Sequence, residues 1–211
     1  MLTLYLIRHG QTDCSKENRF CGSVDVPLNA HGKAMAEALA DAFAGEAWEA
    51  VYASPLLRAR QTAEPLARRL GMTVQIEPGL REIAYGAWDG HLEAEIEQLH
   101  PREFAAWAND PGRVAPPGGE TAPQIADRAL AALHEIRARH PNGRVLAVAH
   151  KATIRILVCA LLGIDVGLFR KRIAQEVGAA TVFEFKDTGP LLKALNDLSH
   201  LPPELRHVEG T

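Results

Sequence analysis

A short apolar run near the start of the chain ends abruptly in two cationic side chains. Residues 2–7 read Leu-Thr-Leu-Tyr-Leu-Ile, and Arg8, His9 and Gly10 follow directly. An apolar run of this length, closed by glycine, predicts a buried central strand of a sheet. Ligands of open α/β sheets bind at the carboxyl ends of strands, so Arg8 and His9 are expected at a small-molecule site. On this stretch alone, a surface arginine beside a half-buried histidine is the alternative.

A second apolar run, residues 144–149, also ends in a histidine, His150. Residues 49–53 predict another short strand, and the Ser54-Pro55 pair after it is typical of a helix start. Arg58 then falls in the first helical turn. A helix N-terminus attracts anions and does not favour a cation. An arginine there therefore indicates a bound anion that lies between the guanidinium and the helix N-terminus.

The remaining pattern alternates helices with strands. Residues 14–22 are expected to form a loop. Residues 80–119 mix an irregular loop, two helical pieces and a Pro/Gly-rich stretch, which suggests an insertion that caps the site. Apolar periodicity and capping residues predict helices at residues 30–44, 55–70, 91–100, 102–109, 121–139 and 151–162, and strands at residues 72–76, 180–186 and 191–195.

Composition narrows the function classes. The chain has 211 residues, 47% hydrophobic and 23% charged, with a net charge of −3. This is typical of a globular protein, and no basic block indicates nucleic acid or a membrane surface as a partner. We see no basic leader and no apolar run long enough to cross a bilayer. An odd set of cysteines, without zinc-ribbon spacing, predicts free thiols in a reducing cytoplasm: Cys14, Cys21 and Cys159.

Two chemistries are open to a site that contains these residues. One is a metal site made by His9, His150 and a carboxylate such as Glu82, which we disfavour because the neighbouring guanidiniums would repel a dication. The other is phosphoryl transfer. Nearby arginines keep a histidine neutral and nucleophilic, and they also bind phosphoryl oxygens. A carboxylic acid would then protonate the leaving oxygen.

The segment Arg8-His9-Gly10-Gln11-Thr12 resembles the signature of the histidine phosphatase superfamily, which includes cofactor-dependent phosphoglycerate mutases and many phosphatases. The resemblance extends over nearly the whole chain, in the family order. Further blocks that resemble the family are residues 19–22, 25–28, 52–55, 58–63, 80–82, 86–90, 117–120 and 148–150.

This resemblance implies a role for each site residue. His9 would be the phosphorylated nucleophile, with Arg8, Arg58 and His150 as the phosphate pocket. Glu82 would be the proton donor, a choice over Asp89 and Glu120 that composition alone leaves open. The implied fold is a single domain, residues 1–211, built as a three-layer α/β/α sandwich with a mostly parallel sheet and a helical capping insertion at about residues 80–119. The implied chemistry needs no metal and no cofactor.

The chain departs from the family at two positions. Cys14-Ser15 replaces a frequent Trp-Asn pair, so Ser15 is expected to donate one hydrogen bond to the phosphate. Lys151 replaces the glycine that commonly follows the second histidine, and its side chain either adds positive charge at the pocket rim or points to solvent. Cys21 and Gly22 are further candidates for substrate contact. Cys14 and Cys21 flank the site loop, which suggests oxidation-sensitive activity.

The function we expect is hydrolysis of a small phosphorylated metabolite through a phosphohistidine. A phosphoglycerate mutase is the first alternative, disfavoured because the insertion offers only scattered arginines. A non-catalytic phosphate-ester-binding regulator is the second, although binding alone needs neither an acid nor a nucleophile. A homodimer is left open. The insertion residues expected to contact the leaving group are Tyr85, Trp88, His91, Arg102 and Trp107. For Trp88 and Trp107 the alternative, a place in the hydrophobic core, is favoured.

Overall fold

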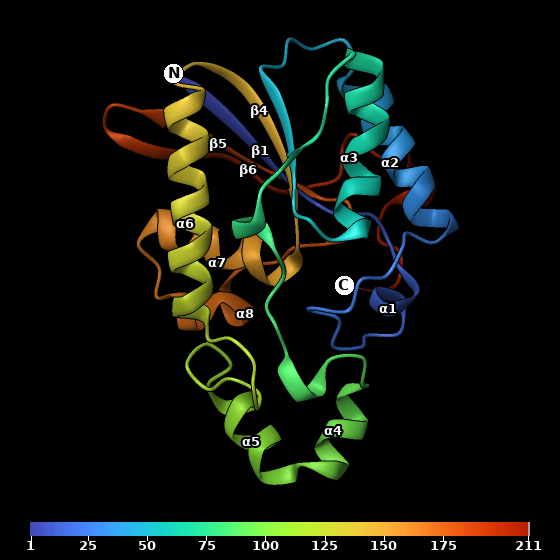
Figure 1. Cartoon of the computed structure of the whole chain (residues 1–211), viewed down its shortest axis with the longest axis vertical. Helices are drawn as coiled ribbons and strands as arrows, with labels where there is room; N and C mark the ends of the chain where they lie inside the picture. The colour runs from blue at the N-terminus through green and yellow to red at the C-terminus, as the bar shows by residue number, and fades with distance from the viewer. Residues whose placement is uncertain (211) are drawn as a thin grey trace.

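The computed structural model describes residues 1–210 and contains one central sheet (Figure 1). The described strands are six, in the order β3-β2-β4-β1-β5-β6. β1 pairs in parallel with β4 and antiparallel with β5, so β5 alone runs against the other strands. This confirms the mostly parallel sheet. The strand bounds are Leu2–Arg8 (β1), Ala50–Ala53 (β2), Gln75–Ile76 (β3), Gly143–Ala149 (β4), Ala180–Lys186 (β5) and Gly189–Asp197 (β6).

Helices cover both faces of the sheet, which confirms the three-layer architecture. α2 (Ala30–Phe43) and α3 (Leu57–Leu70) lie on one face, and α6 (Ala122–Arg139) and α7 (Lys151–Leu162) lie on the other (Figure 1). Side chains of a strand alternate between the two faces. Thus Leu4 and Leu6 of β1 pack in the core with α6 and α7, whereas Ile7 packs with α2 and α3.

The capping insertion has a small core of its own. Its helices α4 (Glu93–Leu99) and α5 (Pro101–Asn109) lie beyond the carboxyl ends of the strands (Figure 1). Trp88 and Trp107 are 0% and 2% exposed and pack against Phe20. Both tryptophans are therefore core residues, as expected. That the chain is one domain stays a prediction.

Several local elements differ from the sequence predictions. The strand expected at residues 72–76 is confined to Gln75–Ile76. Residues 14–16, expected in a loop, belong to the short helix α1 (Asp13–Lys16), because Thr12 and Ser15 make a capping box. The helix expected from Pro55 begins at Leu57, and the Ser54 hydroxyl contacts His150 rather than capping it. The helix α8 (Phe169–Arg172) was not anticipated, since four residues carry no periodic signal.

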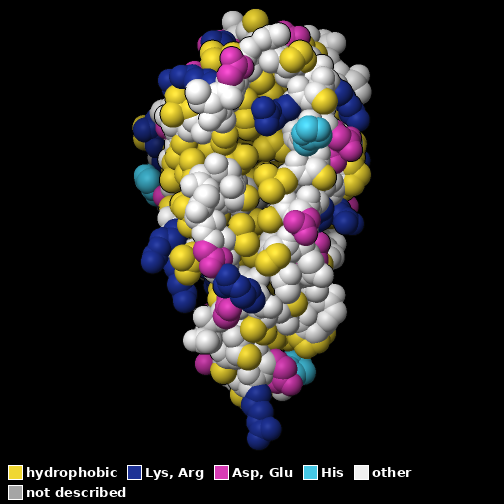
Figure 2. Space-filling view, turned by 90° about the vertical axis from the view of Figure 1, so that its left-hand side faces the viewer, with side chains coloured by type: hydrophobic (Ala, Val, Ile, Leu, Met, Phe, Trp, Pro, Cys, Tyr) yellow, Lys and Arg dark blue, Asp and Glu magenta, His cyan; other side chains and the backbone are white. Residues whose placement is uncertain are grey.

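Among residues 1–210, every helix is either too short or too polar to cross a membrane. Apolar side chains nevertheless gather in a band on the face that Figure 1 shows at its left, where α6 and the hairpin of β5 and β6 lie (Figure 2). On β6, Leu191 and Leu195 are 42% and 39% exposed.

Candidate active site

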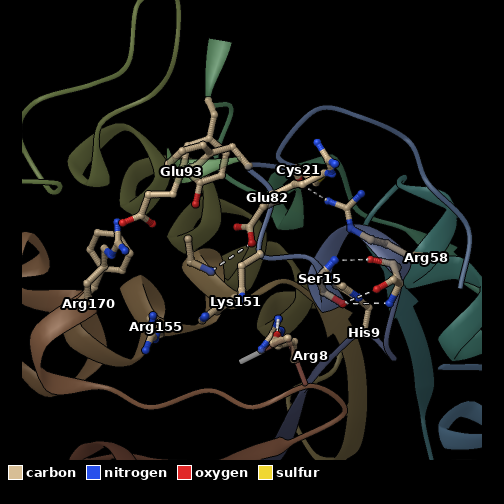
Figure 3. Close-up of a pocket in the computed structure, with 18 residues that line it drawn as sticks. Arg8, His9, Ser15, Cys21, Arg58, Glu82, Glu93, Lys151, Arg155 and Arg170 are labelled. Carbon is tan, nitrogen blue, oxygen red and sulfur yellow. Dashed lines mark hydrogen bonds between the residues drawn. The ribbon is translucent and has the colours of Figure 1, made fainter. Parts of the chain in front are cut away.

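A cavity of about 230 Å³ opens where β1 ends, at the edge of the sheet that the sequence predicts for the site (Figure 3). Four of the five principal candidates line it, and His150 lies directly behind, with its ring centroid 5.1 Å from that of His9. The described lining is Arg8, His9, Thr12, Ser15, Asn18, Arg19, Phe20, Cys21, Arg58, Glu82, Tyr85, Glu93, Lys151, Ala152, Arg155, Phe169, Arg170 and Gly210.

His9 is held with one ring nitrogen available for attack. Its Nδ1 lies 2.8 Å from the carbonyl oxygen of Gly10, so Nδ1–H donates there and Nε2 keeps its lone pair. The Gly10 N–H donates in turn to Thr62 Oγ1 at 3.0 Å, which fixes this turn of the backbone. Burial lowers the pKa of His9 well below its ordinary value, and Arg58 and Arg8 lower it further. The His9 ring is therefore neutral at neutral pH.

Arg8 is buried and aimed by backbone carbonyls. Its Nη1 donates to Gln175 O at 2.7 Å and its Nη2 to Gly210 O at 2.9 Å. Its Nε is buried and has no partner within residues 1–210. Burial lowers the pKa of Arg8 to about 10, so the guanidinium stays charged near neutral pH. The carbonyl oxygens orient the guanidinium but do not neutralise its positive charge, so the group can still pair with an anion.

Arg58 lies on the other side of His9, in the first turn of α3. It is 1% exposed, and its Nη1 donates to Val24 O at 2.8 Å. Its Nη2 donates to Cys21 O at 2.9 Å and to Gly22 O at 3.1 Å. These bonds tie the segment around residues 21–24 to the site and leave the guanidinium without a paired carboxylate among the described residues.

His150 is completely buried and tied to a serine of the neighbouring strand end. Its Nε2 lies 2.7 Å from Ser54 Oγ, and its Nδ1 has no partner within the described chain. Burial lowers the pKa of His150 well below its ordinary value, and Arg58 and His9 add to the effect. His150 is therefore a neutral, buried ring packed beside that of His9, with one nitrogen unpaired in the described chain.

The structure separates the three candidate carboxylates. Glu82 lines the cavity, where its oxygens accept from the N–H groups of Ile83 (2.9 Å), Ala152 (3.2 Å) and Thr153 (3.3 Å). Asp89 instead accepts from Gly22 N at 2.7 Å. Glu120 pairs with Arg128 at 2.9 Å, outside the described lining. Only Glu82 of the three can therefore reach a group in the cavity.

Of the other candidate residues, Ser15, Cys21 and Lys151 line the cavity and Gly22 does not. The Ser15 hydroxyl lies at the cavity but donates to Thr12 O at 2.9 Å, so its hydrogen is engaged within α1. Cys21 lines the cavity. Gly22 is outside the described lining and binds Asp89 and Arg58 through its backbone. Lys151 lines the cavity, which is the first of the two orientations considered for it.

The prediction of free thiols is wrong for two of the three cysteines. Cys14 and Cys21 form a disulfide, and Cys159 is the free, buried thiol. The physical reason is the fold of residues 13–21, because α1 and the loop after it bring the two Cα atoms to 6.3 Å, within disulfide reach. Sequence spacing alone cannot show this approach.

Part of the cavity wall lies outside the site residues predicted from the sequence. Arg155, Arg170, Glu93 and Gly210 all line it. Arg155 had an available signal, since it lies four residues after Lys151 and so on the same helix face. Arg170 and Gly210 lie in segments without a periodic pattern.

A neutral histidine, two carbonyl-oriented arginines and a carboxylate line one cavity, with a second neutral histidine behind it, which is a set suited to phosphoryl transfer. The comparisons with known proteins agree with this chemistry. Residues 4–198 match the family model described as "Histidine phosphatase superfamily (branch 1)". The chain belongs to this family, whose phosphatase-named members make it a hydrolase of phosphate monoesters.

Individual relatives are about one-third identical to this chain over the aligned residues. "Phosphoserine phosphatase 1" of Hydrogenobacter thermophilus is 34% identical over 169 residues, 80% of either chain. "Glucosyl-3-phosphoglycerate phosphatase" of Mycolicibacterium vanbaalenii is 36% identical over 170 residues, 77% of this chain and 75% of that protein. The solved structure "Bacillus stearothermophilus YhfR" is 30% identical and superposes with a TM-score of 0.90, covering 96% of this chain and all of that one.

Proposed function

We propose that this protein is a metal-independent phosphomonoesterase that hydrolyses a small phosphorylated metabolite through a phosphohistidine on His9. The observation that carries the proposal is the state of His9. Its Nδ1–H is bonded to Gly10 O, which leaves Nε2 as an unprotonated nucleophile beside two arginines without carboxylate partners in the described chain. A mere phosphate-binding pocket needs no such nucleophile.

The first step transfers the phosphoryl group to the enzyme. His9 Nε2 attacks phosphorus in line, and the bond between phosphorus and the ester oxygen breaks. Arg8 and Arg58, with His150 beside His9, stabilise the charge on the phosphoryl oxygens. Glu82, in its acid form, gives its proton to the departing oxygen.

The second step returns the enzyme to its starting state. Glu82, now a carboxylate, takes a proton from a water molecule, and the water oxygen attacks phosphorus. The bond between phosphorus and Nε2 of His9 breaks, which releases inorganic phosphate. Glu82 thereby regains the proton that it donated in the first step.

The substrate class follows from the relatives and from the size of the cavity. The two relatives named above are phosphatases of phosphoserine and of glucosyl-3-phosphoglycerate, both small phosphorylated metabolites. A cavity of about 230 Å³ suits a compact ester of this kind. We therefore propose a small phosphorylated metabolite, and no nucleic acid, as the partner of the site.

Phosphate release from a panel of phosphomonoesters, with EDTA present, tests the proposal. We compare the wild type with His9→Ala and with the control His31→Ala, which changes an exposed histidine of α2. We expect the wild type to release phosphate whether or not EDTA is present. His9→Ala should abolish this release, and His31→Ala should retain it. An acid-labile phosphoenzyme should appear on rapid quenching of the wild type.

Two other outcomes would overturn the proposal. Interconversion of 2- and 3-phosphoglycerate without phosphate release would indicate the mutase. Tight binding of phosphate esters without turnover or a phosphoenzyme would indicate the regulator.

The cytoplasmic location and the homodimer stay predictions. The Cys14–Cys21 disulfide removes one argument for a reducing compartment, because disulfides persist mainly in oxidising ones. Cell fractionation tests the location, and size-exclusion chromatography with light scattering tests the dimer.

A further inference from the structure

We propose that Lys151, Arg155 and Arg170 form a second anion subsite, which receives a carboxylate or a second phosphate carried by the leaving group of the substrate. The inference rests on the proposed function and deepens it, because it names a chemical property of the metabolite. Figure 3 shows the three side chains on the side of the cavity away from His9 and Arg58.

The fold places these cations together for a simple geometric reason. Lys151 and Arg155 are four residues apart at the start of α7, so they project from the same helix face. Arg170 comes from α8, which packs against α7. Its guanidinium carbon lies 4.4 Å from the ring centroid of Trp107, so a cation–π contact with the capping insertion holds it in place.

The cations of this wall have no ion-pair partner among residues 1–210. No carboxylate of residues 1–210 lies within 4 Å of a charged nitrogen of Lys151, Arg155 or Arg170. Arg155 Nε is buried without a hydrogen-bond partner in the described chain. A buried, unpaired guanidinium nitrogen costs free energy unless a ligand meets it.

The cavity as a whole carries more cations than a phosphoryl group needs. Its described lining contains six cationic side chains and two carboxylates, Glu82 and Glu93. Arg8 and Arg58 suffice for the phosphoryl charge beside His9. The three cations on the opposite wall therefore indicate a second negative charge in the ligand.

Mutual repulsion among these groups agrees with this interpretation. Burial lowers the pKa of Lys151 to about 7, and Arg8, Arg155 and Arg170 contribute to the shift. Burial and Arg170 also lower the pKa of Arg155. A bound anion would relieve both the repulsion and the lost hydration, as is common at ligand sites.

The position of the subsite limits the size of the leaving group. Lys151 directly follows His150, and the next residue, Ala152, donates its N–H to Glu82. The subsite therefore begins beside the leaving oxygen. At 1.5 Å per residue, Arg155 lies only about 6 Å further along α7. The second anion must then be a few bonds from the ester oxygen.

A three-compound series on one carbon skeleton tests the proposal. Glycerol 3-phosphate has no second anion, 3-phosphoglycerate adds a carboxylate, and glycerol 1,3-bisphosphate adds a phosphate. We expect kcat/KM at pH 6.5 to be at least about tenfold higher for one of the two doubly anionic esters, because a charge-assisted hydrogen bond has that value. Which ester is preferred distinguishes the carboxylate from the phosphate.

Variants connect the preference to the residues. Arg155→Gln and Lys151→Gln should each lower the preference by about tenfold, mainly through KM. The control is Arg172→Gln, which changes an exposed arginine of α8 outside the described lining and should retain the preference. Equal kcat/KM for all three esters, or variants that keep the wild-type preference, would overturn the proposal while the phosphatase function stands.

A binding measurement separates this proposal from the hydrolysis itself. Calorimetry with His9→Ala gives the affinity for each ester without turnover. A preference for the doubly anionic esters that Arg155→Gln removes in this background would support the subsite even if the wild type hydrolysed none of them. Equal affinities for all three esters would contradict it.

Discussion

The Nε2 atom of His150 lies 2.7 Å from the hydroxyl oxygen of Ser54, and both residues are completely buried. They come from the ends of neighbouring strands, β4 and β2. The contact fixes one ring nitrogen of His150, whose ring centroid lies 5.1 Å from that of His9. We therefore expect Ser54 to act as a positioning residue for the proposed phosphate pocket.

The first prediction follows from this contact. Ser54→Ala should lower kcat/KM by about tenfold and the free energy of unfolding by about 1–3 kcal/mol, because a buried ring nitrogen loses its partner. Nitrogen NMR of the imidazole should show a changed tautomer population for His150, which a purely structural role would not produce. Ser199→Ala, at an exposed serine, is the control. Unchanged tautomers together with unchanged kcat/KM would contradict the role.

The second prediction concerns the proton that Glu82 donates. Glu82→Gln should lower kcat/KM for alkyl phosphates by about 10²–10⁴-fold, because an alkoxide needs a proton to leave. The loss should be far smaller for p-nitrophenyl phosphate, whose leaving group is stable as an anion. Rates with both esters measure the difference. An equal loss for both would show that Glu82 does not act as the acid.

The third prediction concerns pH and rests on the anion subsite. With its pKa at about 7, Lys151 is charged below neutral pH and loses its charge above it. The groups that face it are Arg8, Arg155 and Arg170, which lower its pKa, and Glu82, which raises it. The ratio of kcat/KM for a doubly anionic ester to that for glycerol 3-phosphate should therefore fall as pH rises through about 7. Lys151→Gln should give a ratio that is flat over the same range.

The fourth prediction concerns stability in acid. His9 has a pKa well below 6.5 when folded and an ordinary pKa when unfolded. Below about pH 6.5 the unfolded state thus binds a proton that the folded state does not, so stability is lost as pH falls. His9→Gln should show a smaller drop in Tm than the wild type between pH 7.5 and pH 5, in buffers free of phosphate. His31→Gln, with an exposed histidine, should match the wild type.

The sequence predicts the positions of the histidines and of Arg58 for clear physical reasons. Apolar runs that end in a histidine identify two buried strands, and neighbouring strands bring their carboxyl ends together. The structure accordingly places His9 and His150 with ring centroids 5.1 Å apart. Their catalytic roles stay predictions until the experiments above are done.

Other features depend on long-range contacts that no local pattern encodes. Residue types alone leave Glu82, Asp89 and Glu120 equivalent, and the family resemblance favours Glu82. The fold separates them because Asp89 accepts from Gly22 N and Glu120 pairs with Arg128. The approach of Cys14 to Cys21 likewise follows from the turn of α1.

The pairing of β1 with β4 also has a kinetic consequence. Leu4 lies opposite Val145, and the His9 N–H donates to Ala149 O at 3.1 Å. The two strands that carry His9 and His150 at their ends are thus paired although they lie far apart in the sequence. Contacts of such high sequence separation close long loops and form slowly during folding. Recovery of phosphatase activity after dilution from denaturant should therefore report the completion of this non-local sheet, later than the signals of the helices.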